Sequence, residues 1–177
     1  LIENHGSVSA LSGSAILADI GNERVDNYGT ITGNVELGTG SNAFNNLNGS
    51  TFNPLASIAL GSGQLLTNAG TLAPGGKGSV QTSTLTGNLL QTSSGVLGID
   101  LSLAGRSSDR LNVIGNAAVG GNVLVNPVDT GRSRIGTQQT VILNASGGAT
   151  ANSLTLNAPR SPVVSYVLSY PSAREIA

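Results

Sequence analysis

Apolar and polar residues alternate with a period of two along several short stretches of this chain. In residues 31–37, the odd positions carry Ile, Gly, Val and Leu, and the even positions carry Thr, Asn and Glu. The same alternation recurs in residues 97–103 and 117–125. Short alternating runs bounded by glycine and asparagine predict β-strands. Since no segment has helical periodicity, the pattern predicts an all-β chain with almost no α-helix.

A motif with Asn, any residue, Gly, a hydroxyl residue and an apolar residue recurs in the first 72 residues. Its copies lie at 1–8, 24–31 and 65–72, with a looser copy at 47–52, and their glycines are Gly6, Gly29, Gly49 and Gly70. Successive glycines are 23, 20 and 21 residues apart. A sandwich of hairpins requires no repeat of fixed length, whereas stacked coils do. The pattern therefore predicts a parallel β-helix with 20–23 residues per coil.

Each coil is expected to place its motif at the same corner. Stacking in register brings equivalent residues about 4.8 Å apart, so Asn4, Asn27 and Asn68 are predicted to form an internal amide ladder. Gly29 and Gly70, two residues further on, are predicted to supply a positive φ at this corner. The first coil is longer because residues 11–17, which match residues 31–37, follow a three-residue insertion.

The strict motif fades near residue 88, although alternating apolar residues continue. The run Val163–Tyr170 is the most aromatic in the chain and predicts a further strand between prolines. The open end of a β-helix needs a cap, so residues 1–87 are predicted to be stem coils and residues 88–177 the final coils with that cap. The predicted core residues of this second part are Leu97, Ile99, Leu101, Leu111, Val113, Val123, Val125, Tyr166 and Leu168.

Composition narrows the function classes. The chain has 25 glycines, 10% charged residues, a net charge of −1 and no cysteine. Disulfides and thiolate metal sites are therefore excluded, and nothing in the charge predicts nucleic acid as a partner. No apolar run reaches the length of a membrane-spanning helix. The chain begins within a repeat and lacks a signal peptide, which favours an internal fragment of a longer protein.

Candidate catalytic residues are sparse. His5, the only histidine, occupies a variable position of the repeated motif, so a Ser-His-Asp triad is not expected. Residues 74–79 depart from a phosphate-binding loop because Gly78 follows Lys77. Val80 stands where a calcium-binding β-roll requires a carboxylate. We predict a chain that is not an enzyme and holds no cofactor or metal.

One denser group of charges contains Asp100, Arg106, Asp109 and Arg110. The favoured interpretation is an exposed loop with an ion pair, in which Asp109 caps the turn before Leu111. A saccharide or metal site at this place is the less favoured alternative.

The order of motifs in residues 65–126 resembles the C-terminal part of passenger domains from Gram-negative autotransporters of the pertactin type. The matching segments are residues 70–75, 85–91, 95–100, 108–113 and 115–121. The resemblance implies a right-handed β-helix exported through the outer membrane by a C-terminal β-barrel, and placed on the cell surface or secreted. It also implies that the second half is an autochaperone region, which folds first and templates the other coils.

The expected function is therefore a non-catalytic passenger segment whose C-terminal half promotes folding and translocation. Its expected partners are its own upstream coils and the β-barrel translocator. The alternative is an adhesin or self-association surface, in which exposed Asn, Ser and Thr side chains bind a host surface, a glycan or a second β-helix. A catalytic domain upstream of the chain is compatible with both functions.

Overall fold

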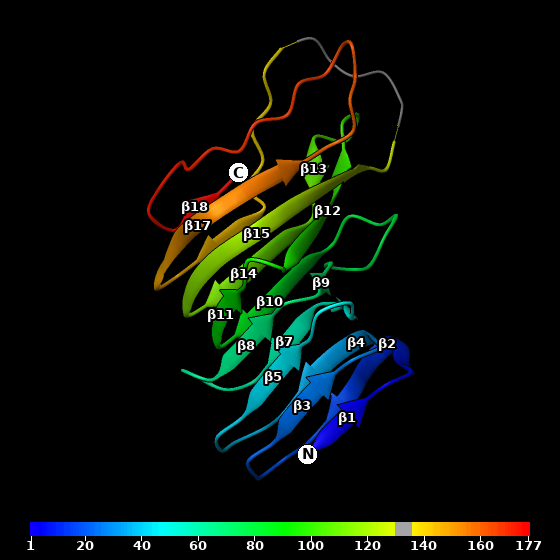
Figure 1. The fold of residues 1–177 in the computed structure, drawn as a ribbon, viewed down its shortest axis with the longest axis vertical. Coiled ribbons are helices and arrows are strands. Elements are labelled where there is room, and N and C mark those ends of the chain that lie inside the picture. Colours follow the sequence, from blue (N-terminus) through cyan, green and yellow to red (C-terminus); the bar gives the residue numbers. More distant parts are fainter. Residues whose placement is uncertain (130–135) are drawn as a thin grey trace.

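The computed structural model describes residues 1–129 and 136–177, and these residues form strands, turns and loops (Figure 1). They contain eighteen strands and no helix, as the sequence predicts. None of the described residues therefore belongs to a helix that could cross a membrane. The strands belong to one sheet, and most of their pairings are parallel.

The eighteen strands are short except near the two ends of the chain. They are β1 (Ile2–Asn4), β2 (Ser7–Leu17), β3 (Arg24–Asn27), β4 (Thr30–Glu36), β5 (Ala43–Asn46), β6 (Thr51–Asn53), β7 (Ser57–Ala59), β8 (Leu65–Asn68), β9 (Thr71–Leu72), β10 (Thr82–Thr86), β11 (Asn88–Gln91), β12 (Val96–Ser102), β13 (Ser107–Ser108), β14 (Arg110–Ile114), β15 (Asn116–Pro127), β16 (Leu143–Ala145), β17 (Gly148–Asn157) and β18 (Glu175–Ile176).

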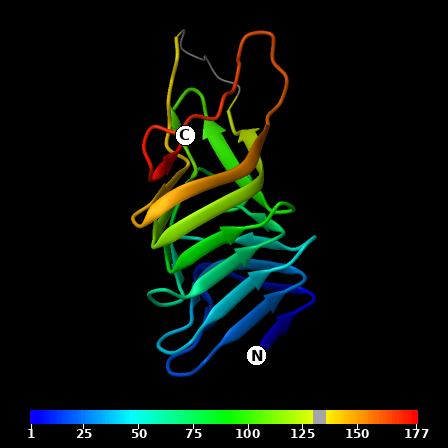
Figure 2. The same ribbon diagram turned by 60° about the vertical axis from the view of Figure 1, so that its left-hand side comes forward.

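Most strands pair with a strand that follows two to four places later in the chain. One ladder runs β1–β3–β5–β8–β11–β15–β17, so successive turns of the chain lie side by side along one long axis (Figures 1 and 2). Its in-register residues are Ile2, Val25, Phe44, Leu66, Leu89, Ala117 and Ala149. The offset between partners is 23 residues at the start and 32 at the end. This pairing is consistent with a solenoid whose turns lengthen toward the C-terminus.

The hydrophobic core follows the same axis. The inward residues of paired strands form columns, so Val25, Phe44, Leu66 and Leu89 are all buried. Phe44 also stacks on Phe52 from the next strand, with ring centroids 4.5 Å apart. A continuous apolar column explains how short strands with few large side chains bury enough surface to be stable.

The register of the looser motif copy differs from the sequence prediction. Asn46, not Asn48, pairs with Asn27, and Thr51 pairs with Thr30. The third corner is therefore two residues longer than the second, and Gly49 falls within this insertion. The prediction that Gly49 is equivalent to Gly29 is wrong, because the buried amide sets the register and the glycine does not.

The predicted positive φ of Gly29 and Gly70 is also wrong, since neither residue is among those with positive φ. Their missing side chain is needed for a different reason. A Cβ atom on Gly29 would lie 2.1 Å from the carbonyl oxygen of Gly6, and one on Gly70 would lie 2.4 Å from that of Leu47. Glycine is required here because neighbouring turns approach closely.

The insertion predicted in the first coil is confirmed. The register of β2 with β4 passes from Ser9–Thr32 to Ser14–Asn34, which leaves three additional residues in β2. A further shift then pairs Ile16 with Val35. The predicted match of residues 11–17 with 31–37 therefore holds at Ser14 but is off by one residue from Ile16 onward, and Leu17 is 73% exposed.

The predicted strand Val163–Tyr170 is not formed, because no strand pairs with this segment. Its alternation is nevertheless visible in its burial. Val164, Tyr166 and Leu168 are half-buried, while Val163 and Val167 are exposed. The pattern of apolar residues therefore predicted which side chains face inward, but not whether the backbone has a partner.

Candidate functional site

A ladder of buried amides runs along one corner of the stacked turns. Asn4 donates its Nδ2 hydrogen to Asn27 Oδ1 at 2.8 Å, Asn27 donates to Asn46 Oδ1 at 2.8 Å, and Asn46 donates to Asn68 Oδ1 at 2.8 Å. Asn68 then donates to Gln91 Oε1 at 3.0 Å. The structure thus brings the predicted residues Asn4, Asn27 and Asn68 into one ladder, which Asn46 completes.

The ladder amides also bind backbone groups at the corner, of their own turn or of the next turn. Asn27 Oδ1 accepts a hydrogen bond from the Gly29 amide at 3.2 Å, and Asn27 Nδ2 donates to the Thr51 carbonyl at 3.0 Å. Asn46 Nδ2 donates in the same way to the Thr71 carbonyl at 2.9 Å. Because every bond is made inside the protein, the cost of burying these polar groups is offset.

Two members of the ladder are missing from the sequence prediction. Asn46 lies in Phe44-Asn45-Asn46, where no glycine follows at the expected distance. Gln91 replaces asparagine at the end of β11, and its longer side chain reaches the Gly120 carbonyl at 2.7 Å. The available signal was an apolar residue two positions before an amide, which is common to every member of the ladder from Asn4 to Gln91.

The second polar site is a pair of buried carboxylates, Asp100 on β12 and Asp109 before β14. Asp109 accepts hydrogen bonds from the Gln81 amide at 2.7 Å and the Asp100 amide at 2.8 Å. Asp100 accepts hydrogen bonds from the amides of Gly78 and Ser79. The two side chains therefore fasten the turn before β10 to the hairpin β12–β13.

Burial raises the pKa of Asp109 to about 7, and the nearby Asp100 carboxylate also raises this pKa, while the two backbone amides lower it. Desolvation outweighs the hydrogen bonds, and within residues 1–129 and 136–177 neither carboxylate forms a salt bridge.

The predicted exposed loop with an ion pair is wrong at this place. Asp100 and Asp109 are buried, whereas the side chain of Arg106 is exposed. Arg110 donates its Nε hydrogen to Asn112 Oδ1 at 2.9 Å instead of pairing with an aspartate. The carboxylates turn inward because backbone amides from residues 78–81 and from Asp100 converge on them, together with the Asn126 side chain. Asp109 holds the turn before β10 by accepting a hydrogen bond from the Gln81 amide. The prediction that Asp109 caps the turn before Leu111 is therefore wrong.

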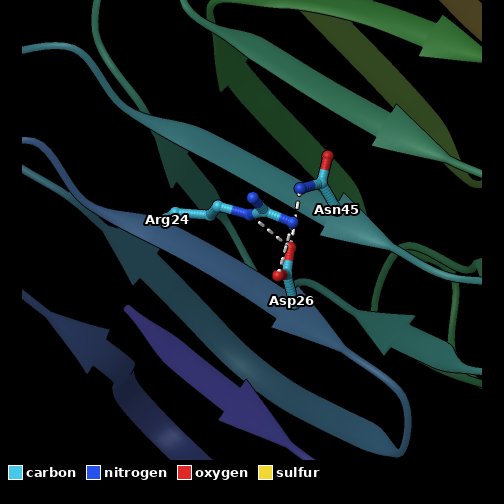
Figure 3. Close-up of polar contacts among 3 residues, drawn as sticks. All are labelled: Arg24, Asp26 and Asn45. Carbon is cyan, nitrogen blue, oxygen red and sulfur yellow. Dashed lines mark hydrogen bonds and ion pairs between the residues drawn. The ribbon is translucent and has the colours of Figure 1, made fainter.

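An ion pair occurs instead on the outer face of β3 and β5 (Figure 3). Arg24 contacts Asp26 at 2.8 Å, and Asn45 Nδ2 donates to Asp26 Oδ1 at 2.7 Å. The guanidinium group lowers the pKa of Asp26 and the carboxylate raises the pKa of Arg24. Beside this cluster, His5 stacks on Tyr28 with ring centroids 4.5 Å apart. His5 therefore packs at an outer corner.

The predicted core residues of the second half divide into two groups. The buried ones are Leu97, Ile99, Leu111, Val113 and Val123. The half-buried ones are Leu101, Val125, Tyr166 and Leu168. All four half-buried residues line a cavity of about 1150 Å³ at the C-terminal end of the stacked turns. They are less buried because the segment Val163–Ser169 arches over this end without filling it.

Within the described residues, no three His, Cys, Asp or Glu side chains gather as a metal site. Comparison of the chain with protein-family models, with curated proteins and with solved structures finds no significant match. The function therefore has to be argued from the ladder, the carboxylate pair and the two ends of the stacked turns.

Proposed function

We propose that this chain is a right-handed parallel β-helical segment of a Gram-negative autotransporter passenger, and that it acts as a stem and not as a catalyst. The proposal combines the sequence resemblance with one structural observation, the amide ladder that continues through five consecutive turns. A ladder of this kind couples each turn to the next and provides no reactive group. Its natural role is to propagate folding along an axis.

The direction of the ladder supports templating from the C-terminus toward the N-terminus. In each link, the earlier turn donates and the later turn accepts. Asn27 Oδ1 accepts hydrogen bonds from both the Gly29 amide and Asn4. Asn4 Oδ1 accepts one from the Gly6 amide, which leaves capacity for a donor from a preceding turn. The edges of β1 and β2 offer further backbone groups to such a turn.

The C-terminal half is proposed to fold first and to promote translocation through the β-barrel at the cell surface. It contains the Asp100–Asp109 pair, which joins segments from residue 78 to residue 126. These contacts do not require the first two turns. Each later turn then adds an apolar column and one ladder link to a preformed edge, so folding outside the membrane biases translocation outward.

The test is surface display of the full-length passenger after deletion of residues 88–177. We expect loss of display and of protease resistance. The control deletes residues 28–46. Asn27 and Asn46 occupy equivalent positions of successive turns, so the deletion joins Asn27 directly to Leu47 and removes one whole turn without changing the register. This control is expected to remain displayed. Normal display and protease resistance after deletion of residues 88–177 would refute the proposal.

The alternative function is adhesion or self-association along the side of the stacked turns. It is favoured by an in-register row of half-buried threonines, Thr30, Thr51 and Thr71, on adjacent strands. Such a row can bind a glycan, a host surface or a second copy through evenly spaced hydroxyls. Sedimentation and cell-aggregation assays of Thr51→Val distinguish this function from a passive stem, since a passive stem is unaffected by the substitution.

A further inference from the structure

The last strand of the stack has an unpaired edge. In the described residues, β17 pairs with β15 on one side and with no strand on the other. Successive backbone groups of a parallel strand point alternately to its two neighbours, so part of the β17 backbone faces this open edge. A long unpaired edge invites association with another strand.

A segment with the pattern of a strand passes directly over this edge. Residues 163–169, here called the strap, follow β17 after the connection 158–162 and run back above β17 in the opposite direction in both views (Figures 1 and 2). Beyond the strap, the Ala149 amide donates to the Ala173 carbonyl at 2.8 Å. The strap is thus held close to β17 at both ends.

The side chains of the strap and of β17 match in one antiparallel register. A five-residue connection of this kind joins hairpin strands, and it places Val164 opposite Leu156 and Tyr166 opposite Leu154. All four side chains are half-buried. Leu154 and Leu156 pack against the core, and Val164 and Tyr166 line the cavity at its end. A register shifted by one residue would place Ser165 among them instead.

We propose that the strap pairs with the open edge of β17 and so closes the C-terminal end of the stacked turns. The structure represents the open form, in which Leu156, the connection 158–161 and the start of the strap line a shallow, solvent-open depression of about 480 Å³. The larger cavity of about 1150 Å³ beneath Tyr166 and Leu168 is the space that closure reduces. Closure covers the edge that would otherwise accept a second copy of the chain.

At its far end the strap is fixed by two backbone hydrogen bonds between Ser169 and Ala177, at 2.8 and 2.9 Å, whereas the hydrogen bonds at its start are local and replaceable. The amides of Val163 and Val164 share the Ser161 hydroxyl, at 3.2 Å each. Gln139 holds the far end through Ser169 Oγ at 3.0 Å. In the closed form, the Val164 amide exchanges the hydroxyl for a β17 carbonyl, so closure gains ladder bonds without leaving this donor unpaired. The inference does not depend on the proposed role in secretion.

The first test is a disulfide in the 177-residue chain, which has no cysteine of its own. Thr155→Cys with Ser165→Cys places two thiols directly opposite each other on the outer face of the proposed hairpin. We expect an intramolecular disulfide under mild oxidation. The control pair, Thr155→Cys with Val164→Cys, is out of register and is expected to form at least about tenfold less. Equal yields from both pairs, or mainly intermolecular dimers, would overturn the proposal.

The second test is amide hydrogen exchange without engineered cysteines. Closure predicts that the amides of residues 154, 156 and 164 exchange at least about tenfold more slowly than in an unfolded chain. Val164→Pro removes a donor of the proposed hairpin, and this variant should lose the protection of residues 154 and 156 while β10 and β14 keep theirs. Exchange of these edge amides at the unfolded rate in the unmodified chain would contradict closure.

Discussion

Replacement of Asn46 by alanine tests the amide ladder at its centre. The side chain donates to Asn68 Oδ1 at 2.8 Å and to the Thr71 carbonyl at 2.9 Å, and it accepts from Asn27 at 2.8 Å and from the Ser50 hydroxyl at 2.7 Å. A buried hydrogen bond contributes about 1 kcal/mol net, and its orphaned partners cost more. We therefore expect Asn46→Ala to lower the free energy of unfolding by about 3–5 kcal/mol.

The assay is equilibrium unfolding in guanidinium chloride, followed by circular dichroism. Asn45→Ala is the matched control, because Asn45 precedes Asn46 on the same strand, but its side chain makes one hydrogen bond within the described residues, to Asp26 on the outer face. It should cost about 1 kcal/mol or less. A lower slope of unfolding free energy against denaturant in Asn46→Ala would mean that the turns before and after it unfold separately. Equal losses in the two variants would refute a stabilising ladder.

Three further perturbations test other parts of the structure. Gly29→Ala should destabilise by about 1–3 kcal/mol through its clash with a neighbouring carbonyl, while Gly6→Ala, where a Cβ meets nothing within 4 Å, should be neutral in the same denaturation assay. The pKa of Asp109, raised to about 7, means that the folded chain binds a proton more tightly than the unfolded chain. Stability should therefore fall as pH rises from about 4 to about 7, and Asp109→Asn should abolish this slope, whatever its effect on absolute stability. Phe44→Ala should lower the free energy of unfolding by about 3–5 kcal/mol because it removes one ring of a buried aromatic stack and leaves a cavity. Leu90→Ala, on the outer face, should lower it by less than about 1 kcal/mol.

The local alternation and the repeat predicted the all-β fold, the parallel stacking and three members of the amide ladder. These predictions succeeded because a buried side-chain amide recurs wherever the backbone groups at the corner need the same hydrogen-bond partners. The register of the third turn was mispredicted because glycine was used as the marker. Gly49 has a positive φ within a corner insertion, whereas Gly29 is needed for close packing. The same residue type therefore answers two different physical requirements.

The carboxylate pair could not be predicted from its neighbourhood in the sequence. Next to Arg106 and Arg110, Asp109 has the pattern of a solvent-exposed charge cluster. Its actual partners are amides at Gln81 and Asp100, which reach it only after the chain has completed a turn. The same limit applies to Asp100, whose partners include Asn126. Contacts across 9–28 residues are invisible to a local pattern, since each of these donors is a backbone amide that every residue type except proline carries.

The strap also shows that a local sequence pattern cannot predict long-range backbone pairing. Alternation within residues 163–170 specifies a face, and the burial of Val164, Tyr166 and Leu168 agrees with that face. A strand additionally requires a partner whose free edge lies in register, and β17 provides one only after it has paired with β15. Because this edge is created when β17 pairs with β15, pairing of the strap depends on completion of the C-terminal turns only. A closed strap would therefore report that the C-terminal end has folded, which makes its hydrogen exchange a direct measure of the first step in the proposed templating.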